Sequence, residues 1–370
     1  MKSTRFPDLR PENWRKVLVR APNWLGDVIM ATPAFARIRS WAIGAELVCG
    51  LRPGHRPILG GSKSFDRLLP LPARKGLRGF RAEVRTLRKE GFDAVVLFPN
   101  SVSSALSATF AGIGVRVGYT RGRRLWITHG LRAKTRKRRR IGGRGPRREP
   151  IPMIDYWFAL LDALGMPEVE PKPILRVTGE EEEAAREKLG ELGLAPRGRL
   201  LLLNPGAAFG PTKLWSPERW AALGAALASD LGEGDLVLIL TGPGEDRLAE
   251  AILRDLPPGL PIRAALDPPI PLGPLKAVVR RAELMVTTDS GPRHIAVAFD
   301  VPHVVLMGPT HPGYTARNLE FATVLRKEVD CGPCHLQTCP LDHRCMEGLE
   351  TAEVLAACRE TLTRRSRAGT

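Results

Sequence analysis

One carboxylate, Asp27, stands in the turn after the apolar run Val17–Val19, in the stretch VLVRAPNWLGDVIMATPAF. Gly26 lets the backbone turn sharply just before this acid, and Trp24 and Leu25 supply apolar surface that can keep water from it. A carboxylate held in this way can accept a proton from a hydroxyl group, a role typically worth roughly 10²–10⁴ in rate. The alternative is that Asp27 only caps a helix or interacts with the helix dipole.

A second polar turn occurs in MVTTDSGPRHIAV, residues 285–297. A strand that ends at Thr287–Thr288 is followed by the turn Asp289–Gly291, and Pro292 stands where the first helical residue is favoured. Backbone N–H groups at the start of this helix, with His294 about one turn further on, would suit phosphate oxygens. Alternatively, the acid or the serine of the turn is only a helix cap, and the histidine is only a surface residue.

Lys213 lies on a loop made pliant by Gly206 and Gly210, ahead of a helix that Ser216–Pro217 begin. An ammonium group on this loop could neutralise a diphosphate leaving group, or it could be one more of the 56 Lys and Arg residues of the chain. The turn Thr241–Gly244 is a similar candidate, for contacts with a base or a ribose.

Each of these turns follows a buried strand. Short apolar runs bounded by turn residues alternate with amphipathic segments, which is the pattern of βα units that build parallel sheets. The expected strands are Val17–Arg20, Ala45–Cys49, Ala94–Phe98, Val115–Tyr119, Leu200–Asn204, Asp235–Leu240, Leu284–Thr287 and His303–Met307. The expected helices lie near Met30–Arg39, Phe80–Lys89, Ser103–Gly112, Pro217–Ser229, Glu245–Leu253, Leu272–Arg281 and Pro292–Phe299.

The length of 370 residues favours two domains, and the fold class is α/β. Ile151–Pro173 is expected to be the linker, a helix followed by prolines that fit neither a helix interior nor a central strand. An acidic helix from Gly179 then opens the second half. Ligands of parallel sheets bind beyond the carboxyl ends of the strands, so both polar turns are expected at one interdomain cleft. Neither turn carries a GxGxxG or GxxxxGK[ST] pattern, which argues against a dinucleotide dehydrogenase or a P-loop ATPase.

The formal net charge of +17 is concentrated between Arg121 and Arg148, where thirteen Lys or Arg residues occur with no Asp or Glu. Such a block favours a polyanionic partner, namely nucleic acid, acidic phospholipid or a phosphorylated glycolipid; the alternative is a solvated loop without a specific partner. The first residues contain no apolar stretch of the secretory kind, and no window reaches the roughly 18 apolar residues of a membrane span. The expected location is therefore cytoplasmic.

Four of the six cysteines fall in one short segment, which differs from the even scatter of a disulfide framework. They are Cys331, Cys334, Cys339 and Cys345, with His335 and His343 between them. Four thiolates could hold a structural zinc ion, although the spacing is not that of paired CxxC motifs. Free or redox-active thiols and, last, stable disulfides are the alternatives.

Taken together, the motifs RAPNWLGDVIMATPAF, NPGAAFGPTKLWSPERW and DSGPRHIAVAFDVPHVVLMGPTHP and the Cys-rich segment resemble the ADP-heptose:lipopolysaccharide heptosyltransferases, in particular the heptosyltransferase II branch. The resemblance runs from about Val17 to Gly348 and implies the GT-B fold with two Rossmann-like domains. Residues 1–172 would bind the lipid-linked acceptor and residues 173–370 the ADP-sugar, and the last helix could pack back on the first domain.

The same resemblance implies roles for single residues. It makes Asp27 the general base of an inverting, in-line displacement that converts β-linked ADP-heptose into an α-linked product. The donor-binding residues that it implies are Lys213, Asp289, Ser290, Gly291 and His294. The adjacent Thr288, and Thr241 and Gly242 of the turn proposed for a base or a ribose, are added to this expected set. The acceptor-binding residues are Asn23, Trp24, Asn100, Arg121 and Arg123. No metal cofactor is required, because Lys213 and the helix end can take the place of a cation.

The resulting hypothesis is a transferase that adds L-glycero-D-manno-heptose to the heptosyl-Kdo2-lipid A inner core of lipopolysaccharide. Its basic block would attract the phosphorylated acceptor and the anionic inner-membrane surface, giving peripheral attachment. One alternative is an ADP-heptose-dependent transferase with a protein or another glycan as acceptor. A nucleic-acid-binding module is disfavoured, because the basic block lacks interleaved aromatic residues and no DNA-binding motif accompanies it.

Overall fold

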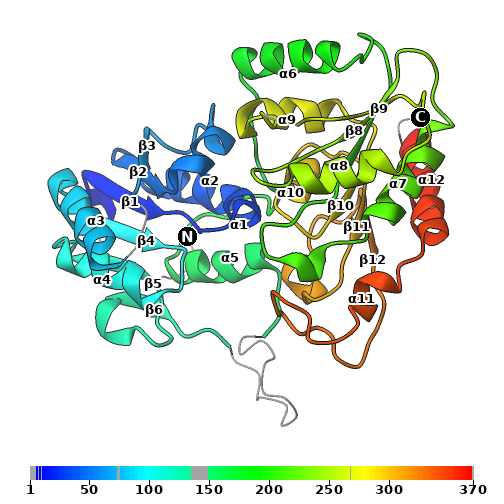
Figure 1. Ribbon diagram of the computed structural model, residues 1–370. Coiled ribbons are helices and arrows are strands. Elements are labelled where there is room, and N and C mark those ends of the chain that lie inside the picture. Colours follow the sequence, from blue (N-terminus) through cyan, green and yellow to red (C-terminus); the bar gives the residue numbers. More distant parts are fainter. Residues whose placement is uncertain are drawn as a thin grey trace. The chain divides into compact units, whose positions relative to one another are not determined.

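The computed structural model describes residues 6, 8–9, 11–72, 76–134, 149–266 and 268–368. The described residues up to Arg176 form one compact unit, and those from Val177 onward form a second (Figure 1). No helix within these ranges is long and apolar enough to cross a membrane. Residues 135–148, which hold most of the basic block, lie outside the described residues.

The first unit is built on a six-stranded parallel sheet with the strand order β3-β2-β1-β4-β5-β6. Its strands are β1 Lys16–Arg20, β2 Glu46–Leu51, β3 Arg67–Pro70, β4 Ala94–Leu97, β5 Val115–Tyr119 and β6 His129–Leu131. Its α-helices are α1 Leu25–Met30, α2 Thr32–Trp41, α3 Gly76–Glu90, α4 Val102–Phe110 and α5 Met153–Ala163. Short 3₁₀ helices are η1 Pro11–Asn13, η2 Pro53–Leu59 and η3 Arg124–Trp126.

Helices cover both faces of this sheet. On one face, α3 and α4 pack over a buried cluster that includes Leu18 of β1 and Val95 of β4. On the other face, α1, α2 and α5 pack together, and Phe98 contacts both Phe35 of α2 and Trp157 of α5. A sheet covered on both faces explains why the central strands read as continuous apolar runs.

The stretch Ile151–Pro173, expected as the linker at the end of a first domain of residues 1–172, contains α5, and α5 belongs to the first unit. Trp157 is buried in the core, and the Tyr119 and Tyr156 rings stack at 3.9 Å between centroids. Burial of these aromatic rings fixes the helix to the first unit, and the change of unit comes after Arg176.

The second unit repeats the architecture, with the strand order β12-β11-β10-β7-β8-β9 and all neighbours parallel. Its strands are β7 Leu200–Asn204, β8 Leu236–Ile239, β9 Ile262–Ala264, β10 Leu284–Thr288, β11 His303–Leu306 and β12 Ala322–Leu325. Its α-helices are α6 Gly179–Glu191, α7 Pro217–Ala228, α8 Asp246–Arg254, α9 Leu272–Arg281, α10 Arg293–Ala298, α11 Arg344–Glu347 and α12 Thr351–Ala368. The 3₁₀ helices are η4 Pro211–Lys213 and η5 Pro312–Thr315.

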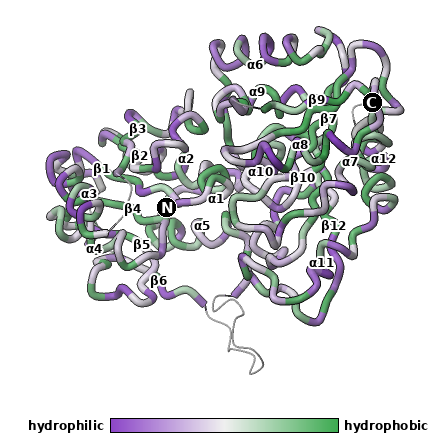
Figure 2. The backbone as a smooth tube through the Cα atoms, in the orientation of Figure 1, coloured by the Kyte–Doolittle hydropathy of each residue, from purple (hydrophilic) through white to green (hydrophobic). Residues whose placement is uncertain are grey.

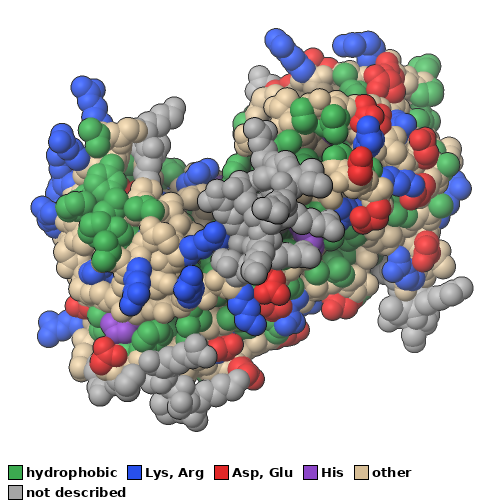
Figure 3. Space-filling model, turned by 90° about the horizontal axis from the view of Figure 1, so that it is seen from below, with side chains coloured by type: hydrophobic (Ala, Val, Ile, Leu, Met, Phe, Trp, Pro, Cys, Tyr) green, Lys and Arg blue, Asp and Glu red, His purple; other side chains and the backbone are tan. Residues whose placement is uncertain are grey.

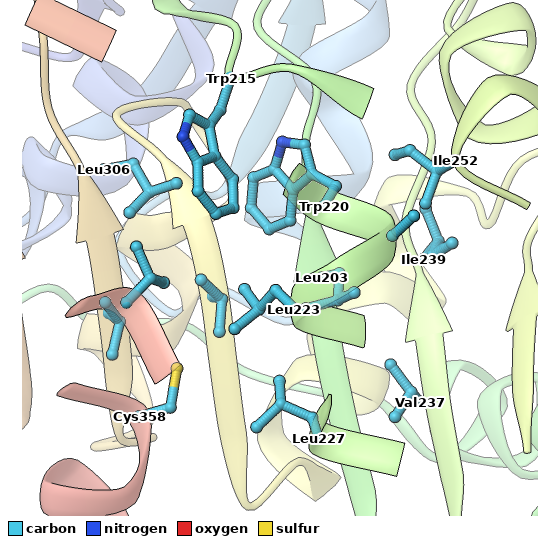
Figure 4. Close-up of a cluster of buried hydrophobic side chains, with 14 of the residues drawn as sticks. Leu203, Trp215, Trp220, Leu223, Leu227, Val237, Ile239, Ile252, Leu306 and Cys358 are labelled. Carbon is cyan, nitrogen blue, oxygen red and sulfur yellow. The ribbon is translucent and has the colours of Figure 1, made fainter. Parts of the chain in front are cut away.

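The main core of the second unit lies between its sheet and the helices α7, α8 and α12, where Trp215 and Trp220 meet edge to face (Figure 4). On the other face α10 packs on β10 and β11, α9 packs on α10, and the largely hydrophilic α6 packs on α9 (Figure 2). From the sequence, the last helix was expected to be able to pack on the first domain. Its described part instead packs against α7 and β10–β12 of its own unit, with Val354 and Cys358 buried in that core.

In sequence order, each sheet has the arrangement 3-2-1-4-5-6 of a Rossmann-like fold. The predicted α/β class with two parallel sheets is therefore confirmed. The order of the strands reverses between β1 and β4 in the first unit, and between β7 and β10 in the second. The loops that leave these four strands at their carboxyl ends lie at the switch points where such sheets bind ligands.

Trp220→Ala should lower the free energy of unfolding by about 3–5 kcal/mol, because it opens a large cavity in the core of the second unit. Trp24→Ala is the matched control, since Trp24 is 48% exposed, and it should cause a much smaller change. Urea denaturation followed by circular dichroism measures both. Equal losses in the two variants would contradict this account of the core.

Candidate active site

The loops that leave β7 and β10 bring two distant polar residues into direct contact. Lys213, at the end of η4, extends its ammonium nitrogen Nζ to within 2.8 Å of Asp289 Oδ2, and Nζ also donates to the Asp289 backbone carbonyl. Both side chains are nearly buried. The sequence singled out these two residues in separate motifs, and the switch point of the sheet explains why they meet.

A second cation holds the same carboxylate. Arg293 donates from Nη1 to Asp289 Oδ1 at 2.8 Å, and the Thr310 hydroxyl donates to Oδ2 at 2.6 Å. Burial alone would raise the pKa of Asp289, but the charges of Lys213 and Arg293 outweigh it and hold that pKa far below its usual range. Asp289 is therefore ionised, and the three charged groups together carry one net positive charge, as two cations and one anion. Such a cluster is suited to an anionic ligand.

Arg293 was not among the residues predicted for the site. Its guanidinium is buried, and it also donates to the Thr315 hydroxyl at 3.2 Å. The signal that could have found it is its spacing of four residues from Asp289, which lets the first residue of α10 reach back to the carboxylate in the preceding turn. Thr310, in the loop after β11, carries no comparable signal in the sequence.

Hydrogen bonds between the two loops fix the turn after β10. Asn204, the last residue of β7, donates to the Thr287 hydroxyl at 2.9 Å and to the Ser290 hydroxyl at 2.8 Å. The Thr288 hydroxyl donates to the Gly206 carbonyl at 2.6 Å. Thr288 and Ser290, both predicted to bind the donor, thus also tie β7 to β10.

The turn itself is less open to an anion than the sequence suggested. The N–H of Asp289 donates to the Leu306 carbonyl, and that of Ser290 donates to the Thr288 carbonyl. The short helix α10 begins only at Arg293, two residues after Gly291. The side-chain cations therefore provide the positive charge of this site more directly than the helix end does.

His294 lies beside this cluster on α10 and is nearly buried. Burial, reinforced by the charge of Arg293, lowers the pKa of His294 to about 3. The imidazole is therefore neutral at physiological pH and can offer a ligand a hydrogen bond but no charge.

The loop after β8 approaches the loop after β7. The Gly242 N–H donates to Glu245 Oε2 at 2.7 Å, and the Thr241 hydroxyl donates to the Ala265 carbonyl. The Glu245 carboxylate lies where a Cβ atom at position 206 would stand, so Gly206 leaves room for the carboxylate in its present position. Glu245, which the sequence did not single out, thus places an acceptor of hydroxyl protons next to the predicted Thr241 and Gly242.

The Cys-rich segment holds the turn that carries Lys213. Thr212 donates from its hydroxyl to the Leu336 carbonyl at 2.6 Å, and its own carbonyl lies 2.7 Å from His343 Nε2. The Thr212 N–H donates to the Gln337 carbonyl at 3.4 Å. The segment therefore positions one of the two cations of the site.

The cysteine cluster was considered as a structural zinc site. All six cysteines are free, and within the described residues no three His, Cys, Asp or Glu side chains are arranged to hold a metal ion. Burial, followed by the three neighbouring thiols Cys331, Cys334 and Cys339, raises the pKa of Cys345. The spacing of these four cysteines in the sequence does not by itself fix how their sulfur atoms are arranged in space.

In the first unit, Asp27 occupies the first turn of α1, directly after β1. Trp24 is the N-cap residue, is 48% exposed and makes no side-chain cap hydrogen bond, and Asp27 is the acidic residue of the first turn. Asn23 is half-buried in the same loop. These residues lie at the switch point of this sheet.

The loop after β4 adds Asn100 to this switch point. Its Nδ2 donates to the Tyr156 hydroxyl at 2.9 Å, and its Oδ1 accepts from Arg123 Nη2 at 3.3 Å. Arg123 is buried and donates to the Tyr119 carbonyl at 2.7 Å and to the Pro99 carbonyl at 2.6 Å. Burial lowers the pKa of Arg123 to about 10.

Arg123 was expected to contact the acceptor, but these bonds give it a different position. Its guanidinium is directed into the protein and braces the Asn100 loop, whereas Arg121 is exposed.

Residues 80–344 match glycosyltransferase family 9 (heptosyltransferase). The chain belongs to this family. The family 9 chain is 26% identical to lipopolysaccharide heptosyltransferase 2 of Escherichia coli K12 over 325 residues, which cover 84% of this chain and 88% of that protein. The identification confirms the resemblance drawn from the motifs and makes the protein a glycosyltransferase.

Solved structures agree with this assignment at the level of the fold. The structure of E. coli ADP-heptose LPS heptosyltransferase II matches with a TM-score of 0.74 and 22% identity, covering 95% of this chain and 99% of that one. A family 9 glycosyltransferase from Veillonella parvula matches with a TM-score of 0.78 and 20% identity, covering 98% and 99%. The predicted GT-B fold is confirmed.

Asp289→Asn should destabilise the protein by about 3–5 kcal/mol at neutral pH, because it leaves two buried cations without their anion. The carboxylate has a lowered pKa when folded, so its contribution is present above about pH 4, the pKa range of an unfolded Asp, and is lost as the pH falls. The difference from wild type should be constant between about pH 5 and 8 and shrink below about pH 4. Urea denaturation across this range measures it. A difference that widens in acid would refute the assignment.

His294 should not titrate above about pH 4, since its pKa is lowered to about 3 by burial. The measurement is the ¹³Cε1 chemical shift of histidines by NMR between about pH 4 and 8. The signal of His294 is identified by its loss in His294→Gln. A midpoint near 6.5 for this signal would show a solvated imidazole instead.

Proposed function

We propose that this family 9 chain transfers L-glycero-D-manno-heptose from ADP-heptose to the heptosyl-Kdo2-lipid A inner core of lipopolysaccharide. The observation that carries the proposal is the contact of Lys213 and Arg293 with Asp289 at the β7–β10 switch point. The relatives at about a quarter identity are named for lipopolysaccharide heptosyl transfer, and one solved structure is named for ADP-heptose.

The donor side of the reaction is assigned to the second unit. As the bond between the anomeric carbon and the β-phosphate oxygen breaks, negative charge grows on the departing ADP. Lys213 and Arg293 supply the positive charge that stabilises it, and neutral His294 supplies a hydrogen bond. The glycosyl donor therefore needs no metal ion for charge neutralisation in this mechanism.

The acceptor side is assigned to the first unit, with Asp27 as general base. The acceptor hydroxyl oxygen forms the new bond to the anomeric carbon from the side opposite ADP, and its proton passes to the Asp27 carboxylate. A single in-line step of this kind inverts the anomeric configuration. Asn23, Trp24, Asn100 and Arg121 would bind the acceptor, and the basic residues 121–148 would attract its phosphates and the anionic inner-membrane surface.

The acceptor decides between this proposal and transfer to a protein or another glycan. Purified enzyme is incubated with ADP-heptose and either heptosyl-Kdo2-lipid A or candidate proteins and glycans, and products are identified by mass. The expected result is one heptose added to the lipid-linked core alone. Transfer to a protein or an unrelated glycan, with none to the core, would overturn the proposed acceptor.

Asp27→Asn should lower kcat by about 10²–10⁴ and leave the affinity for ADP unchanged, because it removes only the proton acceptor. Asp8→Asn is the matched control at an exposed carboxylate of the same unit, and it should retain normal turnover. Steady-state kinetics and calorimetry with ADP measure the two quantities. Near-normal turnover of Asp27→Asn would remove this residue from the chemistry.

Lys213→Met should instead act on ADP binding and weaken it at least about tenfold. The substitution removes the nearly buried cation that pairs with Asp289 and that is proposed to contact the diphosphate. Unchanged ADP affinity in this variant would count against a diphosphate site at Lys213.

A further inference from the structure

The outer surface of α3 and α4 exposes large apolar side chains that the catalytic site does not use. Leu77 is 74% exposed, Phe110 53% and Val102 43%. Phe80 of α3 meets Phe110 of α4 edge to face, with ring centroids 6.1 Å apart. Figure 3 shows a continuous hydrophobic patch over this part of the first unit, with Lys and Arg side chains beside it. Contiguous apolar surface of this kind commonly marks an interaction site.

The cations on α3 lie along one side of the helix. Arg78, Arg81, Arg85 and Arg88 are exposed and follow the three- and four-residue spacing that places side chains in one row. Leu77 lies at the edge of this row, next to the apolar surface. The helix thus presents a strip of cations directly beside a strip of apolar residues.

α3 has two acidic residues, and neither pairs with this row. Glu83 is buried and accepts a hydrogen bond from the Ser107 hydroxyl at 2.9 Å, and Glu90 at the end of the helix pairs with Lys16 and Arg67. The sequence from Val102 to Gly114 has no charged residue. Among the described residues, no ion pair joins Arg78, Arg81 or Arg85 to an acid.

The kind of partner follows from this combination. A second copy docked through the same face would bring the arginine rows of both copies together, which is unfavourable. Nucleic acid would meet the cations but would leave Leu77 and Val102 without a stacking role. An anionic lipid surface satisfies both strips, since apolar side chains enter the acyl boundary while arginines meet the phosphates.

We propose that the α3–α4 face is the surface by which the protein docks on a bilayer containing anionic phospholipid. The inference rests on the proposed function in one respect, because a lipid-linked acceptor lies in such a bilayer. It adds that the acceptor-binding unit makes this contact through a folded helix pair, in addition to any attraction by the basic stretch 121–148.

The test is sedimentation of the full-length protein with vesicles of phosphatidylcholine and phosphatidylglycerol in a ratio of about 7:3, at moderate salt. Arg81→Ser/Arg85→Ser should weaken binding by about thirtyfold, as expected for two cations near a charged surface. Leu77→Ser/Phe110→Ser should also weaken it, by removing the apolar contact.

Matched controls are on the second unit. Arg247→Ser/Arg254→Ser changes two exposed arginines of α8, and Leu341→Ser changes an exposed leucine. They should bind vesicles like wild type. Equal losses in control and patch variants would overturn the proposal, since only net charge would then matter. A dimer in analytical ultracentrifugation that Leu77→Ser/Phe110→Ser dissociates, with unchanged vesicle binding, would overturn it in favour of self-association.

Heptosyl transfer to a deacylated, soluble core acceptor separates this inference from the proposed function. The patch variants should retain that turnover, because α3 and α4 carry none of the predicted site residues. A variant that loses both turnover and vesicle binding is checked for misfolding by circular dichroism. If that variant is folded, the double defect contradicts a docking role. If no acceptor is glycosylated but the patch variants alone lose vesicle binding, the docking surface stands and the proposed function fails.

Discussion

The ion pair of Lys213 and Asp289, shared with Arg293, is the interaction on which the β7–β10 switch point of this protein depends. A buried carboxylate is unfavourable unless cations and hydrogen bonds compensate for lost water, and here each of its partners comes from a different segment. Lys213 stands in a turn held by the Cys-rich segment, Arg293 begins α10, and Thr310 follows β11. The loops of β7, β10 and β11 are therefore linked through one carboxylate, and a shift in any of them would disturb the others.

The sheet order explains why chemistry collects where it does. Both units use the arrangement 3-2-1-4-5-6, so the loops after the first and fourth strands of each unit diverge to opposite faces and leave a crevice. In the first unit these loops hold Asp27 and Asn100, and in the second they hold Lys213 and Asp289. Repeating one topology gives each unit a switch point, and different residues occupy it in the two units.

The central part of each sheet could be predicted from sequence, but its edges could not. Buried on both faces, β1, β4, β7 and β10 show continuous apolar runs, whereas the four strands that the periodicity missed are the edge strands β3, β6, β9 and β12. Edge strands are short and half-exposed, so they lack that signal. Similarly, single motifs indicated Lys213 and Asp289, but their pairing, the role of Arg293 and the inward direction of Arg123 depend on tertiary contacts.

The many basic residues of the chain serve two physical purposes that composition alone does not separate. Buried cations such as Arg123 and Arg293 have acceptors within hydrogen-bond distance, because an unpaired buried charge would be strongly destabilising. Their charge is used locally and is largely hidden from solvent. The exposed arginines of α3 have no acidic neighbour in their row, so their field extends into solvent over about a Debye length. Positive charge therefore attracts distant anions only where the fold leaves the cations exposed and without an acidic neighbour, as it does along α3.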